Sequence, residues 1–326
     1  MRVVVIGGTG HIGTYLVPRL VEAGHAVTSV SRGLRDAYTP HPAWERVARV
    51  VMDRAAEEAA GDFGRRIAEL APEAVIDITC YRLESARQLV DGLRGRVERF
   101  LHCGTIWVHG FNVTVPTTEE QPRRPLEEYG ERKAAIEAYL TEEARGNGFP
   151  AAVIHPGHIV GEGWPPLNPQ GHFSPWVFEK LARGEEIALP HLGLETFHHV
   201  HADDVAQGFE RALENWDHAA GQSFHIVSEV AVTQRGYAEA AASWFGKEAR
   251  LCFLPWEEWR RTVSEQEAFQ SWRHVAHSSH CSIAKARKLL GYEPRYTSFQ
   301  AVREAVEWLV RQGKIAAVLP DGRPSS

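Results

Sequence analysis

A glycine turn between a strand and a helix, within the first two dozen residues, constrains the fold more than any other feature of the sequence. Arg2–Ile6 is rich in β-branched residues, which predicts a strand buried on both faces, and Thr14–Ala23 carries apolar residues at helical spacing. In this context the glycines permit a tight turn, a close approach of backbone to a pyrophosphate, and close packing of helix on strand. The unpaired N–H groups that begin the helix then face the anion. The turn is therefore predicted to hold dinucleotide phosphates, rather than only to reverse the chain, through Gly7, Thr9, Gly10, His11, Ile12 and Gly13.

The composition is that of an ordinary globular protein of 326 residues, with 44% hydrophobic and 24% charged residues. A net charge of −6 argues against nucleic-acid and acidic-membrane partners, which demand a basic surface. No apolar stretch approaches the length that crosses a bilayer, and a strand starting at residue 2 is expected to leave no room for a cleavable signal. The cysteines are scattered, as expected for reduced thiols. These features predict a cytoplasmic protein with no membrane contact.

The end of the second expected strand, Ala26–Ser31, decides which dinucleotide fits. An acid there would accept hydrogen bonds from the adenosine ribose, whereas a small polar residue with an arginine accommodates a 2′-phosphate. The sequence has Ser31 followed by Arg32, and the first acid is Asp36. NADP is therefore favoured over NAD, which stays possible if Arg32 is only a solvated loop arginine.

The next stretches continue the alternation of strands and helices. Strands are expected at Arg49–Met52, Ala74–Thr79 and Phe100–Cys103, and helices at Phe63–Leu70 and Ser85–Leu93. This order predicts an α/β fold with a Rossmann-type, doubly wound parallel sheet, whose ligands bind at the carboxyl ends of its strands. Thr79 and Asp53 follow the carboxyl ends of two of these strands and are therefore further candidate cofactor contacts. Asp53 has the alternative of capping a helix or forming a turn.

Three polar residues follow the fifth expected strand. Thr105 comes just after it, and Tyr129 and Lys133 lie four apart on one face of a helix expected at Tyr129–Ala144. Many surface helices carry such a pair without any chemistry. The alternative is that the lysine ammonium, with the charge of an oxidised nicotinamide, lowers the phenol pKa toward neutrality. Tyr129 would then move a proton at a substrate oxygen that Thr105 holds, while hydride moves at the attached carbon.

With these motifs in place, the chain resembles the extended short-chain dehydrogenase/reductase family, the NAD(P)-dependent epimerase/dehydratase group. The resemblance rests on the glycine turn, on Thr105 and on the Tyr129/Lys133 pair, and is supported by residues 154–161, 199–206 and 284–294. It implies that Tyr129 is the acid/base, that Lys133 modulates it and binds the ribose, and that Thr105 positions the oxygen. It also implies that Pro156 and its neighbour His158 face the nicotinamide.

Two departures from the family pattern narrow the reaction. Dehydratases of the family carry an Asp-Glu pair directly after the hydroxyl residue, where this chain has Ile106 and Trp107, so a dehydratase is disfavoured. Nucleotide-sugar epimerases commonly carry a diphosphate-binding arginine near residues 197–199, where this chain has Phe-His-His. Imidazole cannot make the bidentate fork of arginine, which puts a UDP-sugar substrate in doubt.

The loop at residues 161–173 is expected to lie over the sugar, because the family's variable region does so. Aromatic faces suit the apolar side of a pyranose. The substrate candidates are Trp107, Trp164, Asn168 and His172, the last of which is as easily a core-capping histidine.

The histidines raise the question of a metal. His199 and His201 would share one face of a strand while His198 points away, and two histidines without a third ligand make a poor zinc site. His274, His277, His280 and Cys281 are irregularly spaced. No metal is expected.

The sequence therefore predicts two units and a tail. The dinucleotide-binding domain is expected at residues 1–156, with residues 197–228 returning to it. A smaller substrate-binding lobe is expected at residues 157–196 and 229–318, with helices at 234–245, 255–267 and 298–312. The tail is expected at residues 319–326. The expected function is that of an NAD(P)-dependent epimerase or oxidoreductase of a sugar or nucleotide-sugar-like substrate, possible as a homodimer. The alternative is a non-catalytic dinucleotide-sensing or RNA-associated protein on the same scaffold.

Overall fold

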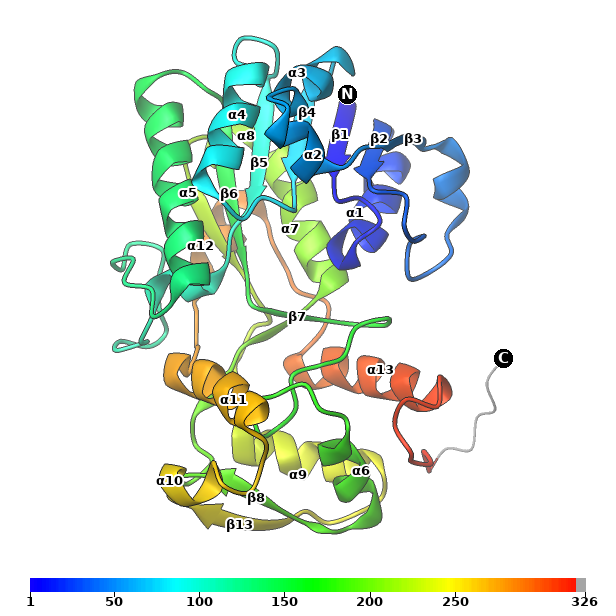
Figure 1. Cartoon of the computed structure of the whole chain (residues 1–326), viewed down its shortest axis with the longest axis vertical. Helices are drawn as coiled ribbons and strands as arrows, with labels where there is room; N and C mark the ends of the chain where they lie inside the picture. The colour runs from blue at the N-terminus through cyan, green and yellow to red at the C-terminus, as the bar shows by residue number, and fades with distance from the viewer. Residues whose placement is uncertain (321–326) are drawn as a thin grey trace.

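The computed structural model describes residues 1–320, and its centre is a seven-stranded parallel sheet (Figure 1). The strand order is β11-β6-β5-β4-β1-β2-β3. The bounds are β1 (Arg2–Ile6), β2 (Ala26–Ser31), β3 (Ala48–Val51), β4 (Ala74–Asp77), β5 (Arg99–Cys103), β6 (Ala151–Pro156) and β11 (Ser223–Ile226). Every pairing in this sheet is parallel. The expected Rossmann-type, doubly wound α/β fold is thus confirmed.

Strand β1 supplies both faces of the sheet, because successive side chains of a strand point to opposite sides. Val3 and Val5 join one buried cluster, while Val4 and Ile6 join another. The first cluster packs under α1 (His11–Glu22), α7 (Ala202–Glu214) and α12 (Ala284–Leu290), and the second under α3 (Phe63–Glu69), α4 (Leu83–Leu93) and α5 (Glu128–Gly146). Burial on both faces explains why β1 reads as an unbroken apolar run.

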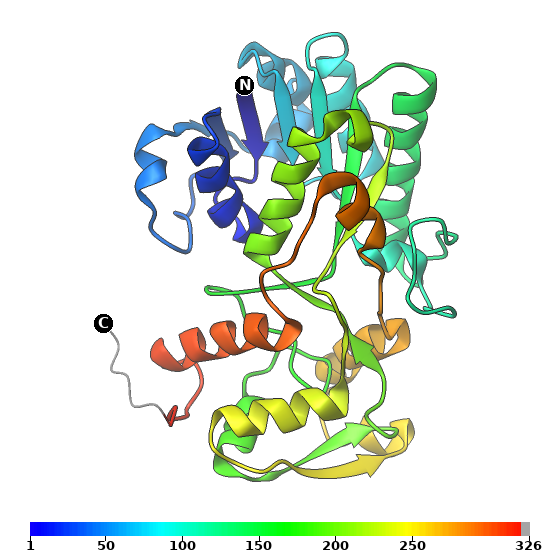
Figure 2. The ribbon, with the colours of Figure 1, turned by 180° about the vertical axis from the view of Figure 1, so that it is seen from behind.

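The smaller lobe lies below the carboxyl ends of the sheet (Figures 1 and 2). It holds a parallel pair of strands, β8 (Glu186–Pro190) and β13 (Arg250–Leu254). Its helices are α6 (Trp176–Arg183), α9 (Gln234–Trp244), α10 (Trp256–Trp259), α11 (Glu265–His277) and α13 (Ser298–Arg311). A separate apolar core, with Phe178, Phe197 and Tyr237 at its centre, holds these pieces together.

The remaining short elements fall into two groups. The sheet half also contains η1 (Pro42–Arg46), α2 (Arg54–Ala59), η2 (Ile106–His109) and α8 (Trp216–Ala219). The other group consists of β7 (His158–Val160), β9 (Thr196–Phe197), β10 (His199–His201) and β12 (Val232–Thr233). Strands β7 and β10 run parallel, and β9 pairs antiparallel with β12. Because β7 follows directly on β6 and β10 leads directly into α7, the chain passes between the sheet and the lobe at these two strands.

The helix expected at residues 255–267 is wrong. The structure has a short α10 that ends at Trp259 and a separate α11 that begins at Glu265. Ser264 caps α11, and its hydroxyl and the Glu267 carboxylate satisfy each other's backbone N–H groups in a capping box. The Ser-x-x-Glu spacing that starts a new helix was therefore present in the sequence, inside a stretch read as one helix.

The boundary of the smaller lobe also needs correction. Residues 281–292, assigned to that lobe from the sequence, return to the main sheet (Figure 2), where Ala286, Leu290 and Tyr292 are buried in the first cluster. The Tyr292 hydroxyl donates to the Val227 carbonyl at 2.9 Å. Of the expected tail, residues 321–326 lie outside the described residues. Within residues 1–320, no helix combines the length and the apolar character that crossing a membrane requires.

The core is unusually rich in histidine. Eleven of the 17 histidines are buried. Burial disfavours the charged imidazole, and it lowers the pKa of His198, His199 and His274 to about 3 each. The folded protein therefore holds these rings neutral at pH 7.

This neutrality predicts an acid-sensitive fold. Below about pH 6.5 the histidines of the unfolded chain take up protons, whereas the buried rings of the folded protein do not. The contribution of these rings to the free energy of unfolding is therefore fully present above that pH and is lost between about pH 6.5 and 3. Urea unfolding at pH 7.5 and at pH 5.0 measures how far the free energy of unfolding falls between the two. We expect His198→Gln to make that fall smaller by about 2 kcal/mol. The exposed His218→Gln is the matched control and should leave the loss unchanged. Equal losses in both variants would contradict the assignment.

Candidate active site

The glycine turn lies at one end of a cavity of about 600 Å³. Gly7 has a φ of +92°, a conformation that favours glycine. A Cβ on Gly13 would stand 2.2 Å from the Gly8 carbonyl oxygen, so only glycine lets α1 lie this close to the turn. The tight turn at Gly7 and the close packing of α1 at Gly13, both expected from the sequence, are therefore seen in the geometry. Gly13 itself lies beneath the turn, and the cavity is lined by the predicted cofactor residues Gly7, Thr9, Gly10, Ser31, Arg32, Asp53 and Thr79.

The far end of this cavity is the region expected to hold the adenosine. Ser31 Oγ accepts the Gly33 N–H at 3.3 Å, and Arg32 is exposed beside it. Asp53 caps α2 by accepting the N–H groups of Ala55 and Ala56, at 3.0 and 3.4 Å. Asp53 thus serves as the helix cap that was its alternative role, and it still faces the cavity.

A second cavity of about 380 Å³ shares Gly7, Gly10 and Thr79 with the first. It runs past the carboxyl ends of β4, β5 and β6 to the smaller lobe. The predicted residues that line it are His11, Ile12, Thr105, Trp107, Tyr129, Lys133, Pro156, His158 and Trp164. The two cavities together give one continuous cradle with a glycine turn at its middle, which fits a dinucleotide with one nucleoside on each side.

Lys133 is the most buried charged residue of the site, with 1% of its surface exposed. Its ammonium donates to the carbonyl oxygens of Cys80 and Cys103, at 2.7 and 2.6 Å. It also stands 4.6 Å from the centre of the Tyr81 ring. Burial lowers the pKa of Lys133, and the two carbonyls compensate the desolvated charge.

Tyr129 is less acidic than an ordinary tyrosine in the protein by itself. The ring is 36% exposed, but the hydroxyl end faces the cavity, where burial raises the pKa of the phenol above its usual value. A hydrogen bond with the Thr105 side chain opposes that rise. The predicted lowering requires an oxidised nicotinamide as well as the lysine ammonium, so it stays a prediction for the cofactor complex; in the protein by itself the ammonium bonds to two backbone carbonyls.

Thr105 is held by its own backbone. It caps η2, and its hydroxyl accepts the Trp107 N–H at 3.3 Å. Its N–H donates to Nδ1 of the buried His155 at 2.9 Å. Because Nδ1 accepts this hydrogen bond, Nε2 is the ring nitrogen left to face Glu137.

A buried chain of charges continues from that ring. Nε2 of His155 lies 3.0 Å from Oε1 of Glu137, one turn beyond Lys133 on α5. Arg123 grips the same carboxylate through Nε and a terminal nitrogen, at 3.0 and 2.5 Å. Burial alone would raise the pKa of Glu137, but His155 and Arg123 hold it well below the usual range. Arg123, Glu137 and His155 thus connect the loop before α5 to the backbone of Thr105.

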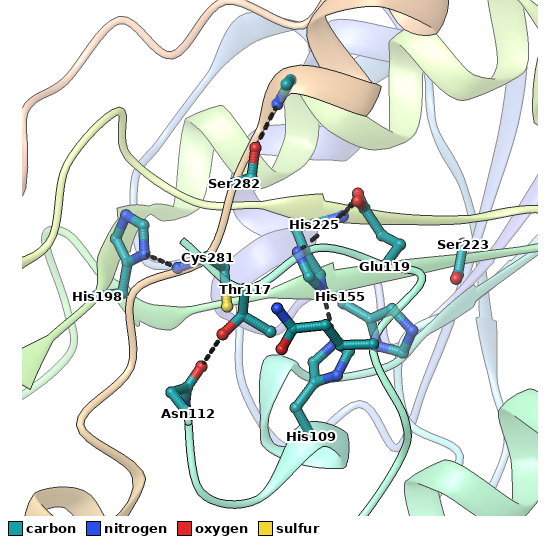
Figure 3. Close-up of polar contacts among 12 residues, drawn as sticks. His109, Asn112, Thr117, Glu119, His155, His198, Ser223, His225, Cys281 and Ser282 are labelled. Atoms are coloured by element: carbon teal, nitrogen blue, oxygen red, sulfur yellow. Dashed lines mark hydrogen bonds and ion pairs between the residues drawn. The ribbon is translucent and has the colours of Figure 1, made fainter. Parts of the chain in front are cut away.

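Further polar residues surround this chain (Figure 3). His109 and His225 face each other with their Nε2 atoms 2.9 Å apart, and the His225 N–H donates to Glu119 at 2.8 Å. Beside them, the Cys281 N–H donates to Nδ1 of His198 at 3.0 Å. The Glu119 contact ties the 110–125 loop to the edge strand β11, and the Cys281 contact ties the returning segment to the residue between β9 and β10.

Two predicted substrate residues do not reach the cavity. Asn168 and His172 are fully buried, and their side chains bond to each other at 2.9 Å. Asn168 also donates to the Ser174 carbonyl, and Nε2 of His172 meets Oε1 of Gln170 at 2.9 Å. Their hydrogen-bonding groups are used within the loop, so the core-capping alternative describes His172.

Sequence reasoning missed several lining residues, namely Arg35, Tyr81, Leu167, Phe173, His199 and His274. The sequence suggested His199 as a metal ligand or as a residue at the diphosphate position, and His274 as a metal ligand. Their place in the cavity follows from β10 and α11 both bringing a ring to His158 of β7, which no local pattern shows.

One set of possible metal ligands occurs among residues 1–320. Donor atoms of Asp77, Cys80 and His102 lie within 4.8 Å of one another. Arg54 donates to Asp77 at 2.7 Å, and burial, with Lys133 nearby, holds the pKa of His102 well below its usual range. Because two cations already face these donors, they make a poor site for a divalent ion.

Comparison with known proteins gives a family match over most of the chain. The sequence profile described as the NAD dependent epimerase/dehydratase family matches residues 3–226. The 2'-dehydrokanamycin reductase of Streptomyces kanamyceticus is 28% identical, over 97% of this chain and 86% of the relative. The chloroplast stem-loop binding protein of 41 kDa b of Arabidopsis thaliana is 24% identical, over 93% of this chain and 78% of the relative.

Solved structures agree in fold. A UDP-glucose 4-epimerase of Thermotoga maritima, solved with UDP-glucose, superposes with a TM-score of 0.72 at 22% identity, over 96% of this chain and 99% of the other. A UDP-glucuronic acid 4-epimerase of Bacillus cereus, solved with UDP-glucuronic acid and NAD, gives 0.72 at 17% identity, over 96% and 100%. At these identities the likeness concerns the fold alone.

The chain through Glu137 gives a stability prediction. Glu137→Gln removes a buried carboxylate and leaves the Arg123 charge without its partner, so we expect a loss of about 2–3 kcal/mol in the free energy of unfolding. Urea unfolding at pH 7.5 measures it. Glu142→Gln, an exposed site on the same helix, should change stability by less than about 0.5 kcal/mol. Similar values for the two variants would show that the buried chain contributes little.

Proposed function

The chain belongs to the NAD dependent epimerase/dehydratase family, and we propose that it moves a hydride between NADP and a carbon of a sugar-like substrate, as a reductase or an epimerase. The observation that carries the proposal is the meeting of Thr105, Tyr129 and Lys133 in one cavity. That cavity is continuous with the cradle at the glycine turn. Proton transfer and hydride transfer can therefore occur side by side.

The protein's own groups have distinct tasks in this mechanism. The Thr105 hydroxyl holds the substrate oxygen, and the Tyr129 phenol gives or takes the proton on that oxygen. Lys133 fixes the position of Tyr129 by anchoring α5 to two carbonyls, and it presents a positive charge beneath the cofactor ribose. A bound nicotinamide supplies or accepts the hydride, and its oxidised form adds the positive charge that makes the phenol more acidic.

NADP is the proposed cofactor within an NAD(P)-dependent family. Ser31 is small, and the exposed Arg32 lines the adenosine end of the cavity, where a 2′-phosphate would lie. Arg35 lines the same cavity and adds a second cation. An acid that would repel this phosphate is missing at the end of β2, since the described strand closes on Ser31.

Two relatives point to different kinds of function. The first is named as a reductase and the second as a stem-loop binding protein. The net charge of −6 and the assembled Thr105, Tyr129 and Lys133 side chains support an enzyme over an RNA-associated or purely sensing protein. A cytoplasmic location and a homodimer are further parts of the proposal, the former supported by four free cysteines.

The acid/base assignment predicts a selective loss of turnover. Tyr129→Phe should lower kcat by about 10²–10⁴-fold on any sugar or ketosugar that the wild type converts, because the proton has no other carrier. NADPH binding, measured by fluorescence titration, should persist. Tyr139→Phe, on the same helix, is the matched control. Equal turnover by wild type and Tyr129→Phe, across a panel assayed for both NADPH oxidation and epimerised product, would refute the role.

The cofactor assignment predicts a charge effect. Arg32→Glu should weaken NADPH binding at least about tenfold, since it places a carboxylate beside the 2′-phosphate, and should change NADH binding little. Isothermal titration with both cofactors gives the ratio of the two dissociation constants. If the substitution weakens both cofactors alike, the preference for NADP is lost.

A further inference from the structure

The part of the second cavity that lies beyond the cofactor cradle is lined by rings. Phe173 and Trp164 are 39% and 38% exposed, and both belong to the loop at residues 161–173. Trp164 stacks one face on His11, with ring centres 5.1 Å apart. His158, His199 and His274 complete this wall, with His158 lying 5.9 Å from His199 and 4.9 Å from His274. The substrate therefore meets aromatic faces and imidazoles.

His199 carries unused hydrogen-bonding capacity. The residue is fully buried, and neither ring nitrogen has a partner. The Leu167 carbonyl, which accepts the Tyr237 hydroxyl at 2.7 Å, is, among residues 1–320, the one backbone acceptor that approaches the ring. Burial keeps the pKa of His199 at about 3, so the ring offers one N–H donor and one lone pair. An unpartnered buried polar group is costly, and a ligand hydroxyl, itself both donor and acceptor, satisfies such a ring.

The charged groups near this wall are already engaged. Among residues 1–320, the lysine and arginine side chains that line the cavity are Lys133 and Arg35. Lys133 is bonded to two carbonyls, and Arg35, on the cofactor side, donates to the Tyr38 hydroxyl at 2.5 Å. A diphosphate needs forked or clustered cations, which this wall does not present.

One more arginine lies behind the wall. Arg273 of α11 stands over the Trp107 ring at 5.1 Å and pairs with the Glu127 carboxylate. The negative charge of Glu127 contributes to the raised pKa of Tyr129. An anionic group that reached the remaining donor of Arg273, its Nε, would therefore lie close to this carboxylate.

On the basis of the proposed function, we propose that the substrate is a glycoside without phosphate groups, whose hydroxyls pair with His199 and whose ring packs on Trp164 and Phe173. The neutral imidazoles, the aromatic loop and the paired cations point to the same class. Sugars joined to a nucleoside diphosphate are then poor ligands, although the fold is shared with enzymes solved with such ligands.

Binding to the full-length protein loaded with NADP tests this inference. Isothermal titration, checked by quenching of the tryptophan fluorescence of the protein, compares maltose and methyl α-D-glucopyranoside with UDP-glucose and UDP. We expect at least one unphosphorylated glycoside to bind at least tenfold more tightly than UDP-glucose. Tighter binding of UDP-glucose or UDP, or binding of no glycoside, would overturn the inference.

Variants separate the wall from the rest of the molecule. His199→Leu should weaken the glycoside by about tenfold and leave the NADP dissociation constant unchanged, whereas His280→Leu, outside the cavity, should change neither. Equal glycoside binding in His199→Leu and wild type would also overturn the inference. If NADP does not bind to the wild-type protein at all, that result counts against the proposed function. If NADP binds but the glycosides do not, only the inference about the substrate fails.

Discussion

The site depends on one buried ammonium. Lys133 joins α5 to the carbonyls of Cys80 and Cys103, just past β4 and at the end of β5. A buried ammonium costs several kcal/mol unless its protons find acceptors, so α5 has one rotation at which this lysine is tolerated. At that rotation, Tyr129 lies one turn earlier and faces the cavity, and Glu137 lies one turn later and meets His155. A single contact thus aligns the proton carrier and the chain that holds Thr105.

Low polarity governs the remaining chemistry. The phenol of Tyr129 is made less acidic by burial, and the imidazoles of His158 and His199 are held neutral by it. In the proposed mechanism such a phenol carries a proton only when a positive charge lies beside it, which a bound oxidised nicotinamide would provide. The same low polarity would disfavour unpaired anions at the substrate wall. The proposed cofactor dependence and the proposed preference for a substrate without phosphate groups then have one physical cause.

Much of the cofactor half could be read from the sequence, because its determinants are local. The glycine turn, the end of β2 at Ser31 and the spacing of Tyr129 and Lys133 each combine a residue type with a period or a neighbouring element. The family resemblance rested on the same residues, and the profile match to residues 3–226 confirms it. The fold class follows from the alternation of strands and helices, whereas the strand order is seen only in the structure.

The substrate half could not be predicted in the same way, because its parts meet only in the tertiary structure. His199 and His274 come from β10 and α11, 75 residues apart, and reach one wall. Asn168 and His172 sit in the right loop but bond inward. The acidity of Tyr129 also depends on its burial and on its hydrogen bond with Thr105, which only the tertiary structure shows.

A crystal structure of the NADP complex would show whether Lys133 and α5 bring Tyr129 to the nicotinamide. We expect the nicotinamide ring between Thr105, Pro156 and Tyr129, with the phenol hydroxyl facing the reacting carbon and the adenosine phosphate beside Ser31 and Arg32. A nicotinamide bound away from Tyr129, or a Tyr129 hydroxyl turned out of the cavity with Lys133 released from its carbonyls, would contradict it.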